Sequence, residues 1–270
     1  GYNTDMVNIL RMWSAQSPKT IDLQSFGRGN YAKALEGRVF AEVLCKVLYP
    51  EDDHFEGKRL RLNQHYFFTA ASLRYMINEY KREYGDDLQN LHEKAVVHIN
   101  DTHPGLAIPE LMRLLIDEEG FGWEEAERTV SSMVAYTNHT IMSEALERWP
   151  EEMVKAQFPR VYQILQEMNR RLCERLWQRF PGEWDRIAQM AILAYGQVHM
   201  ANLCVAYAYS VNGVSRLHGD ILRRSTFRDF HLVMPEKFRA ITNGITHRRW
   251  LMMANPRLSD LITRAIGGKW

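Results

Sequence analysis

Apolar residues recur at helical spacing along much of the chain. They predict helices over Tyr31–Leu48, Gln64–Tyr84 and Arg160–Phe180. In the last of these stretches the apolar positions form one stripe, and four arginines fall largely outside it. We expect this basic face to be a solvated helix surface. The alternative is a surface that binds phosphate or a sugar polymer.

Four short apolar runs each lead into a polar loop and then a helical pattern. The expected strands are Ala95–Ile99, Met133–Tyr136, Leu203–Tyr209 and Phe238–Ile241. The loops that follow them are Asn100–Pro104, Thr137–Thr140, Val211–Gly213 and Thr242–Gly244. In open α/β sheets, ligands bind outside the carboxyl ends of the strands, where loops combine free backbone N–H groups with side chains held by the sheet. The pattern predicts a helix-rich α/β fold with short, mostly parallel strands and a cleft for a polar ligand.

Composition narrows the class of protein further. The formal net charge of +1 gives no attraction to nucleic acid or to an anionic membrane. No apolar run approaches the roughly 20 residues that a membrane-spanning helix needs. Three widely spaced cysteines suggest free thiols in a reducing compartment.

The chain is expected to be one structural unit, because no Ser/Gly linker or low-complexity tract interrupts residues 1–270. Its first residue is Gly1 rather than Met, and its last residues, Gly267–Trp270, stop just after a helical pattern. We therefore expect an internal piece of a longer protein. Its exposed end should leave apolar surface uncovered at Trp250, Leu251, Met252 and Trp270.

The loop Asn100–Pro104 has two simple interpretations besides a ligand loop. Asp101 or Thr102 could cap the helix that follows, which is predicted over Ile108–Glu118. A metal site of His98, Asp101 and His103 is the other. We expect no metal there, because His98 belongs to the strand pattern, in which side chains alternate in direction, and no cysteine pair or His-Glu helix motif supports one.

His139 is the histidine that stands out, because it follows a predicted strand and lies beside two threonines and an amide. It could be catalytic or only structural. Gly27-Arg28-Gly29 lacks a third glycine and a preceding strand, so it is a poor dinucleotide fingerprint. The residues alone therefore predict an α/β domain with a polar ligand cleft and do not name a reaction.

Several longer motifs, taken together, resemble the α-glucan (glycogen or maltodextrin) phosphorylase family. The chief ones are His98–Pro104, Ile108–Arg113, Ala135–Thr140, Glu144–Pro150, Val211–Val214 and Thr242–Thr246, with Arg248–Trp250 after them. Leu10–Ala15 and Phe55–Leu62 also fit. The motifs run in the family's order over nearly the whole chain. Three positions depart from the usual pattern: His247 replaces a proline, Asn202 a histidine, and Asp53 an amide.

The resemblance implies a glycosyltransferase-B arrangement, in which two Rossmann-like domains face a deep cleft. The chain is similar to the later half of the N-terminal domain, and the family's cofactor lysine and its substrate-phosphate groups belong to the second domain. The parent enzyme would cleave α-1,4-glucan with inorganic phosphate to glucose 1-phosphate, retaining the anomeric configuration. Pyridoxal phosphate would contribute its phosphate group as a proton relay. A cytoplasmic homodimer is implied, and this chain alone is expected to be inactive.

The resemblance also assigns residues. It implies that His139 contacts the transferred glucosyl unit, with its backbone carbonyl near the anomeric centre, and that Asn243 holds a distal hydroxyl. The other implied substrate residues are Asp101, His103, Thr140, Asp52 and Asp53, the last two on a mobile loop that gates the cleft. Trp250 falls where the family packs against the cofactor.

Two alternatives remain. One is a glucan-binding or structural segment without chemistry of its own, which phosphorolysis by the parent would exclude. The other is a nucleotide-sugar transferase that shares the fold. Enzymes of that kind lack the loop Asn100–Pro104, which disfavours this alternative.

Overall fold

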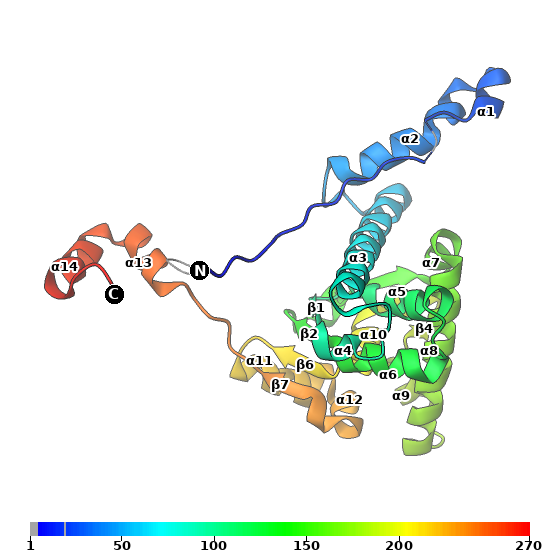
Figure 1. Ribbon diagram of the computed structural model, residues 1–270. Coiled ribbons are helices and arrows are strands. Elements are labelled where there is room, and N and C mark those ends of the chain that lie inside the picture. The colour runs from blue at the N-terminus through cyan, green and yellow to red at the C-terminus, as the bar shows by residue number, and fades with distance from the viewer. Residues whose placement is uncertain (1–4, 19) are drawn as a thin grey trace.

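A computed structural model describes residues 5–18 and 20–270, whose main body contains a parallel four-stranded sheet (Figure 1). The strand order is β1–β2–β6–β7. The strands are β1 (Val97–Asn100), β2 (Val134–Asn138), β6 (Ser210–Gly213) and β7 (Phe238–Ala240). This arrangement confirms the helix-rich α/β fold with short parallel strands.

The two faces of the sheet differ in burial. Successive side chains of a strand point to opposite faces. Ile99, Tyr136 and Val211 are aligned across three strands and are fully buried in the core. His98 and Asn100, at the alternate positions of β1, are exposed. One face is therefore apolar and covered, whereas the other carries polar side chains toward the carboxyl ends of the strands.

The crossover from β1 to β2 is helical. It contains α5 (Ala107–Arg113), a π-helical turn at Leu114–Glu118 and α6 (Trp123–Met133). The predicted helix over Ile108–Glu118 is confirmed, with Pro109 in its first turn, where backbone N–H groups have no partner within the helix.

The crossover from β2 to β6 is longer. Its helices are α7 (Glu151–Gln157), α8 (Pro159–Arg179), α9 (Trp184–Met190) and α10 (Met200–Tyr207). Between them lies a small antiparallel sheet, in the order β3–β5–β4, made of β3 (Arg148–Pro150), β5 (Gln197–His199) and β4 (Leu193–Ala194).

Helix α8 carries its apolar stripe inward, as predicted. Leu165, Met168 and Leu172 are fully buried. On the opposite face Arg171 and Arg175 form ion pairs with glutamates of α6, and Arg170 with Glu167 of α8 itself. The basic face thus carries ion pairs, and those of Arg171 and Arg175 connect α8 to α6.

One predicted strand is wrong. Residues Leu203–Tyr209 were expected to be extended, but α10 occupies Met200–Tyr207 and the strand β6 begins only at Ser210. All eight residues of α10 are buried. A helix buried on every side has no polar face, so its sequence shows a continuous apolar run rather than a helical period.

Glycine permits close packing beside β6. A Cβ atom on Gly213 would lie 2.8 Å from the backbone nitrogen of Gly219 in α11 (Arg216–Ile221). A Cβ atom on Gly219 would in turn lie 2.6 Å from that of Ala240 in β7. The helix therefore approaches the sheet to a distance that only glycine allows at these positions.

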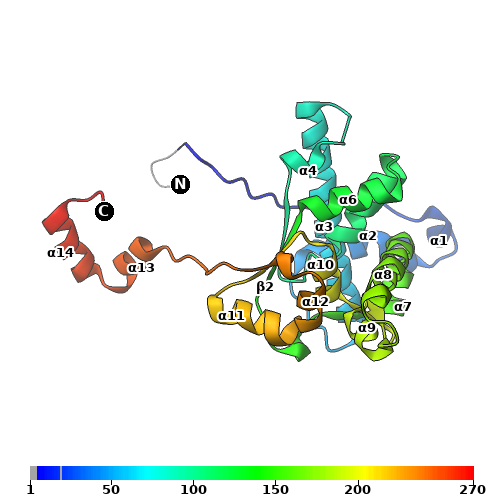
Figure 2. The same cartoon turned by 90° about the horizontal axis from the view of Figure 1, so that it is seen from below.

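Both ends of the chain extend from the main body (Figures 1 and 2). Near the N-terminus, α1 (Leu23–Gly27) and α2 (Tyr31–Lys46) pack on each other, and α2 contacts α3 (Phe55–Tyr84). At the other end, α13 (His247–Ala254) and α14 (Pro256–Ile266) follow an extended stretch at 241–246. The remaining helical segments are α4 (Leu91–Lys94), α12 (Arg228–Val233), a π turn at Leu222–Thr226 and 3-10 turns at Ser143–Ala145 and Pro235–Lys237.

The predicted apolar exposure at the C-terminal end is confirmed for Trp250 and Met252, which are 66% and 50% exposed. Leu251 and Trp270 are half-buried. Within residues 5–18 and 20–270, each helix is too short or too polar to cross a lipid bilayer.

Candidate functional site

A pocket of about 550 Å³ lies on the polar face of the parallel sheet. We call it the sheet pocket; its polar lining includes His98, Asn100, Thr137, His139, Asn212 and Asn243. These side chains come from three strands and from the loops after β2 and β7. The sequence placed such residues in separate loops, and the sheet brings them together.

His139 is fixed at the rim of the sheet pocket. Its Nε2 lies 2.7 Å from Oδ1 of Asn100, on the neighbouring strand. An amide oxygen can only accept a hydrogen bond, so Nε2 donates and, in a neutral ring, Nδ1 remains an acceptor. The exposed imidazole is therefore held by the sheet while one ring nitrogen stays available to a ligand.

Asn138, the residue before His139, fixes the loop after β2 through its buried side chain. Asn138 is fully buried, and its Nδ2 donates to the Tyr136 hydroxyl at 2.9 Å. Its Oδ1 accepts from His218 Nε2 at 3.0 Å and from the Thr140 backbone N–H at 3.1 Å. Every polar atom of the Asn138 side chain thus has a partner, and these bonds fix the backbone on both sides of His139.

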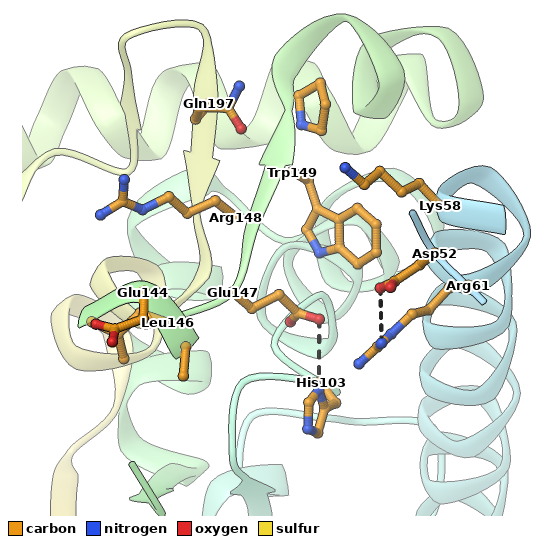
Figure 3. A pocket seen from close by; sticks show the side chains of 12 residues that line it. Asp52, Lys58, Arg61, His103, Glu144, Leu146, Glu147, Arg148, Trp149 and Gln197 are labelled. Atoms are coloured by element: carbon orange, nitrogen blue, oxygen red, sulfur yellow. Dashed lines mark hydrogen bonds and ion pairs between the residues drawn. The ribbon is translucent and has the colours of Figure 1, made fainter. Parts of the chain in front are cut away.

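A second pocket, of about 660 Å³, lies between α3 and the segment around β3 (Figure 3). We call it the Glu147 pocket; its charged lining is Asp52, Lys58, Arg61, His103, Glu144, Glu147 and Arg148. In Figure 3, Arg61 reaches Asp52, and Glu147 points toward His103. The Arg61 Nη1 to Asp52 Oδ2 distance is 2.9 Å.

Glu147 is the most buried acidic side chain of this pocket, at 11% exposure. Its Oε1 lies 3.5 Å from Nδ1 of His103 and 3.6 Å from Nδ1 of His65. His65 comes from the middle of α3 and is itself 14% exposed. Two imidazoles from distant parts of the chain therefore converge on one buried carboxylate.

Burial and charge set the protonation of this group. Burial lowers the pKa of His65 to about 4, so its imidazole is neutral at pH 7. The Glu147 carboxylate raises the pKa of His103. Burial acts to raise the pKa of Glu147, but His103, His65 and Arg61 outweigh it, and the pKa lies below its usual range. Glu147 is therefore an ionised carboxylate at neutral pH.

The structure divides the sequence-predicted residues between the two pockets. His139 and Asn243 line the sheet pocket, whereas Asp52 and His103 line the Glu147 pocket. Asp101 lies between them in the loop after β1, and its Oδ1 accepts the Thr102 backbone N–H at 2.7 Å.

Other predicted residues lie outside both linings. Asp53 is exposed at the N-terminal side of α3. The Thr140 hydroxyl accepts the Met142 backbone N–H at 3.2 Å, which closes a turn after His139. Trp250 is exposed on α13, a helix that lies away from the sheet (Figure 1).

His98 and His103 do not share a site. His98 binds the Thr137 hydroxyl at 2.6 Å in the sheet pocket, while His103 faces Glu147. Among the residues that the structure describes, the histidines and carboxylates close enough to share a metal ion are His65, His103 and Glu147. Sequence reasoning missed His65 and gave Glu147 no role.

The structure shows where two of the three residues that depart from the family pattern lie. Asn202 is buried in α10 and donates from Nδ2 to the carbonyls of Gln189 and Ala191, at 2.9 and 2.8 Å. It therefore connects α10 to the end of α9. His247 is the exposed first residue of α13.

Comparison with known proteins covers the whole chain. The model of the carbohydrate phosphorylase family matches residues 1–270. A glycogen phosphorylase of Bacillus subtilis (strain 168) is 48% identical over 270 residues, and the muscle form of glycogen phosphorylase from Bos taurus is 43% identical over 280 residues. Each comparison covers 100% of this chain and 33% of the relative. The chain thus spans about a third of the length of these relatives.

Proposed function

The chain belongs to the carbohydrate phosphorylase family, and we propose that it is part of an enzyme that cleaves α-1,4-glucan with inorganic phosphate. The products would be glucose 1-phosphate, with retained anomeric configuration, and a shortened glucan. Residues 1–270 would belong to the N-terminal domain of that enzyme. The observation that carries the proposal is the sheet pocket, in which His139 and Asn243 from two separate family motifs line one cavity.

The sheet pocket suits a sugar ring. It offers imidazole, amide and hydroxyl groups, all of which form hydrogen bonds with polyhydroxylated ligands. Cleavage of a glycosidic bond develops positive charge on the anomeric carbon. A backbone carbonyl fixed near that carbon would stabilise this charge without reorganising. The hydrogen bonds of Asn138 with the Thr140 N–H and with His218 provide such rigidity.

The Glu147 pocket is proposed to border the glucan path. Asp101 and His103 would shape this subsite, and Asp52 and Asp53 would lie on the gating loop before α3; His103 and Asp52 line the pocket. Thr140 would contribute its hydroxyl hydrogen, since its oxygen already accepts the Met142 N–H. Such contacts would hold the chain in register for reaction.

Pyridoxal phosphate is the proposed cofactor, supplying a phosphate group for proton transfer when bound. Trp250 is proposed to contact it, and the 66% exposed indole provides a flat face for a planar ring. The other cofactor contacts would come from the two thirds of the relatives' length that this chain does not span. We also propose a homodimer in the cytoplasm.

The decisive test is His139→Ala in the full-length protein. We expect kcat/KM for phosphorolysis of maltodextrin to fall by about 10²-fold or more, the scale of losing one placed group in a dry site. The matched control is His92→Ala, which removes an exposed histidine of α4 and should leave kcat/KM unchanged. Thermal melting of both variants shows whether the fold survives.

Two outcomes would contradict the proposal. A wild-type rate in His139→Ala with a lowered melting point would mean that His139 is structural. Full-length protein that binds maltodextrin but releases no glucose 1-phosphate would favour a glucan-binding protein without this chemistry.

A further inference from the structure

Three parts of the chain place potential metal ligands at one point in the Glu147 pocket. His65 comes from α3, His103 from the loop after β1, and Glu147 from the residue before β3. One ligand atom from each lies within 4.8 Å of the other two. None of the sequence motifs predicts this group, because its members are separated by about 40 residues each.

Hydrogen bonding does not account for the convergence. The two distances from Glu147 Oε1 to the imidazole nitrogens, 3.5 and 3.6 Å, are too long for good N–H···O bonds. Moreover, Glu147 Oε2 is buried without a hydrogen-bond partner within the described part of the chain, and His103 Nδ1 has only the long 3.5 Å contact to Glu147 Oε1. Buried polar atoms in folded proteins are nearly always satisfied, so these orphaned atoms indicate a missing partner.

The separations suit a metal ion. Zinc binds histidine nitrogen and carboxylate oxygen at about 2.0–2.2 Å, so neighbouring ligand atoms in a tetrahedral site lie roughly 3.3 Å apart. The observed 3.5 and 3.6 Å approach this value. Two imidazoles disfavour calcium and magnesium, which prefer oxygen ligands.

We propose that His65, His103 and Glu147 bind one divalent transition-metal ion, with zinc as the best match. His103 is 44% exposed toward the pocket, which leaves a fourth position open to water or an exchangeable ligand. Arg61 is the nearest opposing charge, but Asp52 pairs with it at 2.9 Å.

The test is a titration of the full-length protein, treated with a chelator and then freed of it, with ZnCl₂ in a calorimeter. We expect one ion per chain. His65→Gln and Glu147→Gln should each weaken zinc binding by at least about 10-fold, because each removes a ligand. His92→Gln, which changes an exposed histidine of α4, should bind zinc as the wild type does. The proposal would be overturned if the wild type bound no zinc, or if both ligand variants bound zinc with the affinity of the wild type.

A second measurement needs no variant. Co²⁺ in a tetrahedral site of nitrogen and oxygen ligands gives visible d–d absorption, and added Zn²⁺ should abolish it. Bound Co²⁺ with only an octahedral spectrum would contradict the site even if the variants do not fold. Binding is measured without glucan or phosphate, so its failure leaves the proposed phosphorolysis untouched, and loss of phosphorolysis would not bear on zinc.

Discussion

Asn138 offers the sharpest test of how the fold holds His139. Asn138→Leu keeps the size of the side chain but removes all three of its hydrogen bonds. The bonds are the Tyr136 hydroxyl at 2.9 Å, His218 Nε2 at 3.0 Å and the Thr140 N–H at 3.1 Å. Because Asn138 is fully buried, water cannot replace the lost partner. The variant should therefore destabilise the loop after β2 and leave the distant helices α1 and α2 unaffected.

The expected cost follows from counting orphaned groups. Leaving a buried polar group without its partner costs about 1–3 kcal/mol. Three groups lose a partner, so we expect about 3–9 kcal/mol. This is a large share of the roughly 5–15 kcal/mol that stabilises a typical protein.

Hydrogen exchange localises this loss. Peptides that cover 134–142 and 211–219 should exchange at least about 10²-fold faster in Asn138→Leu, since 1.4 kcal/mol corresponds to one factor of ten. Asn90→Leu is the matched control, because Asn90 is exposed and makes no side-chain capping bond at α4. Unchanged exchange in both peptides, together with a wild-type melting temperature, would refute the reasoning.

Two further predictions concern packing and pH. Gly213→Ala should lower the free energy of unfolding in urea by about 1–3 kcal/mol, because its Cβ would meet the Gly219 backbone. The control is Gly27→Ala, which has open space around it and should change this free energy little. Equal losses in the two variants would contradict this prediction. The pKa of His65 is lowered from 6.5 to about 4, so unfolding takes up a proton between these values and stability falls as the pH falls. With a chelator present, the free energy of unfolding of the wild type should fall by up to about 3 kcal/mol more than that of His65→Gln between pH 6.5 and 4. Equal falls in the two proteins over this pH range would contradict this prediction.

The sequence predicted those helices and strands that have one buried, apolar side and one polar side or polar end. Helix α8 has a buried stripe and a charged face, and β1, β2 and β7 each end in polar loops. It failed at α10, where burial on all sides removes the period. The sheet pocket followed from topology, because all four strands are parallel and their carboxyl ends, including those of β2 and β7, lie at one edge of the sheet.

The Glu147 pocket was harder to predict, since its members have no shared pattern in the sequence. His65 occurs in a long helix whose period only shows that one side is buried. Glu147 lies inside the motif Glu144–Pro150, whose spacing is not typical of metal or acid–base sites. Only the packing of α3 against the segment around β3 brings them within reach of His103.

The loop after β1 joins the two pockets physically. Asp101 has φ of 58°, a left-handed conformation that most residues avoid and that Asp tolerates when its carboxylate bonds locally, as Oδ1 does with the Thr102 N–H. The Asp101 N–H also donates to the Thr137 carbonyl, which fixes the turn to β2. Because of this turn, Asn100 faces His139, whereas His103, three residues later, faces Glu147. A ligand or ion that holds His103 therefore acts on the same short, anchored segment that positions Asn100 against His139.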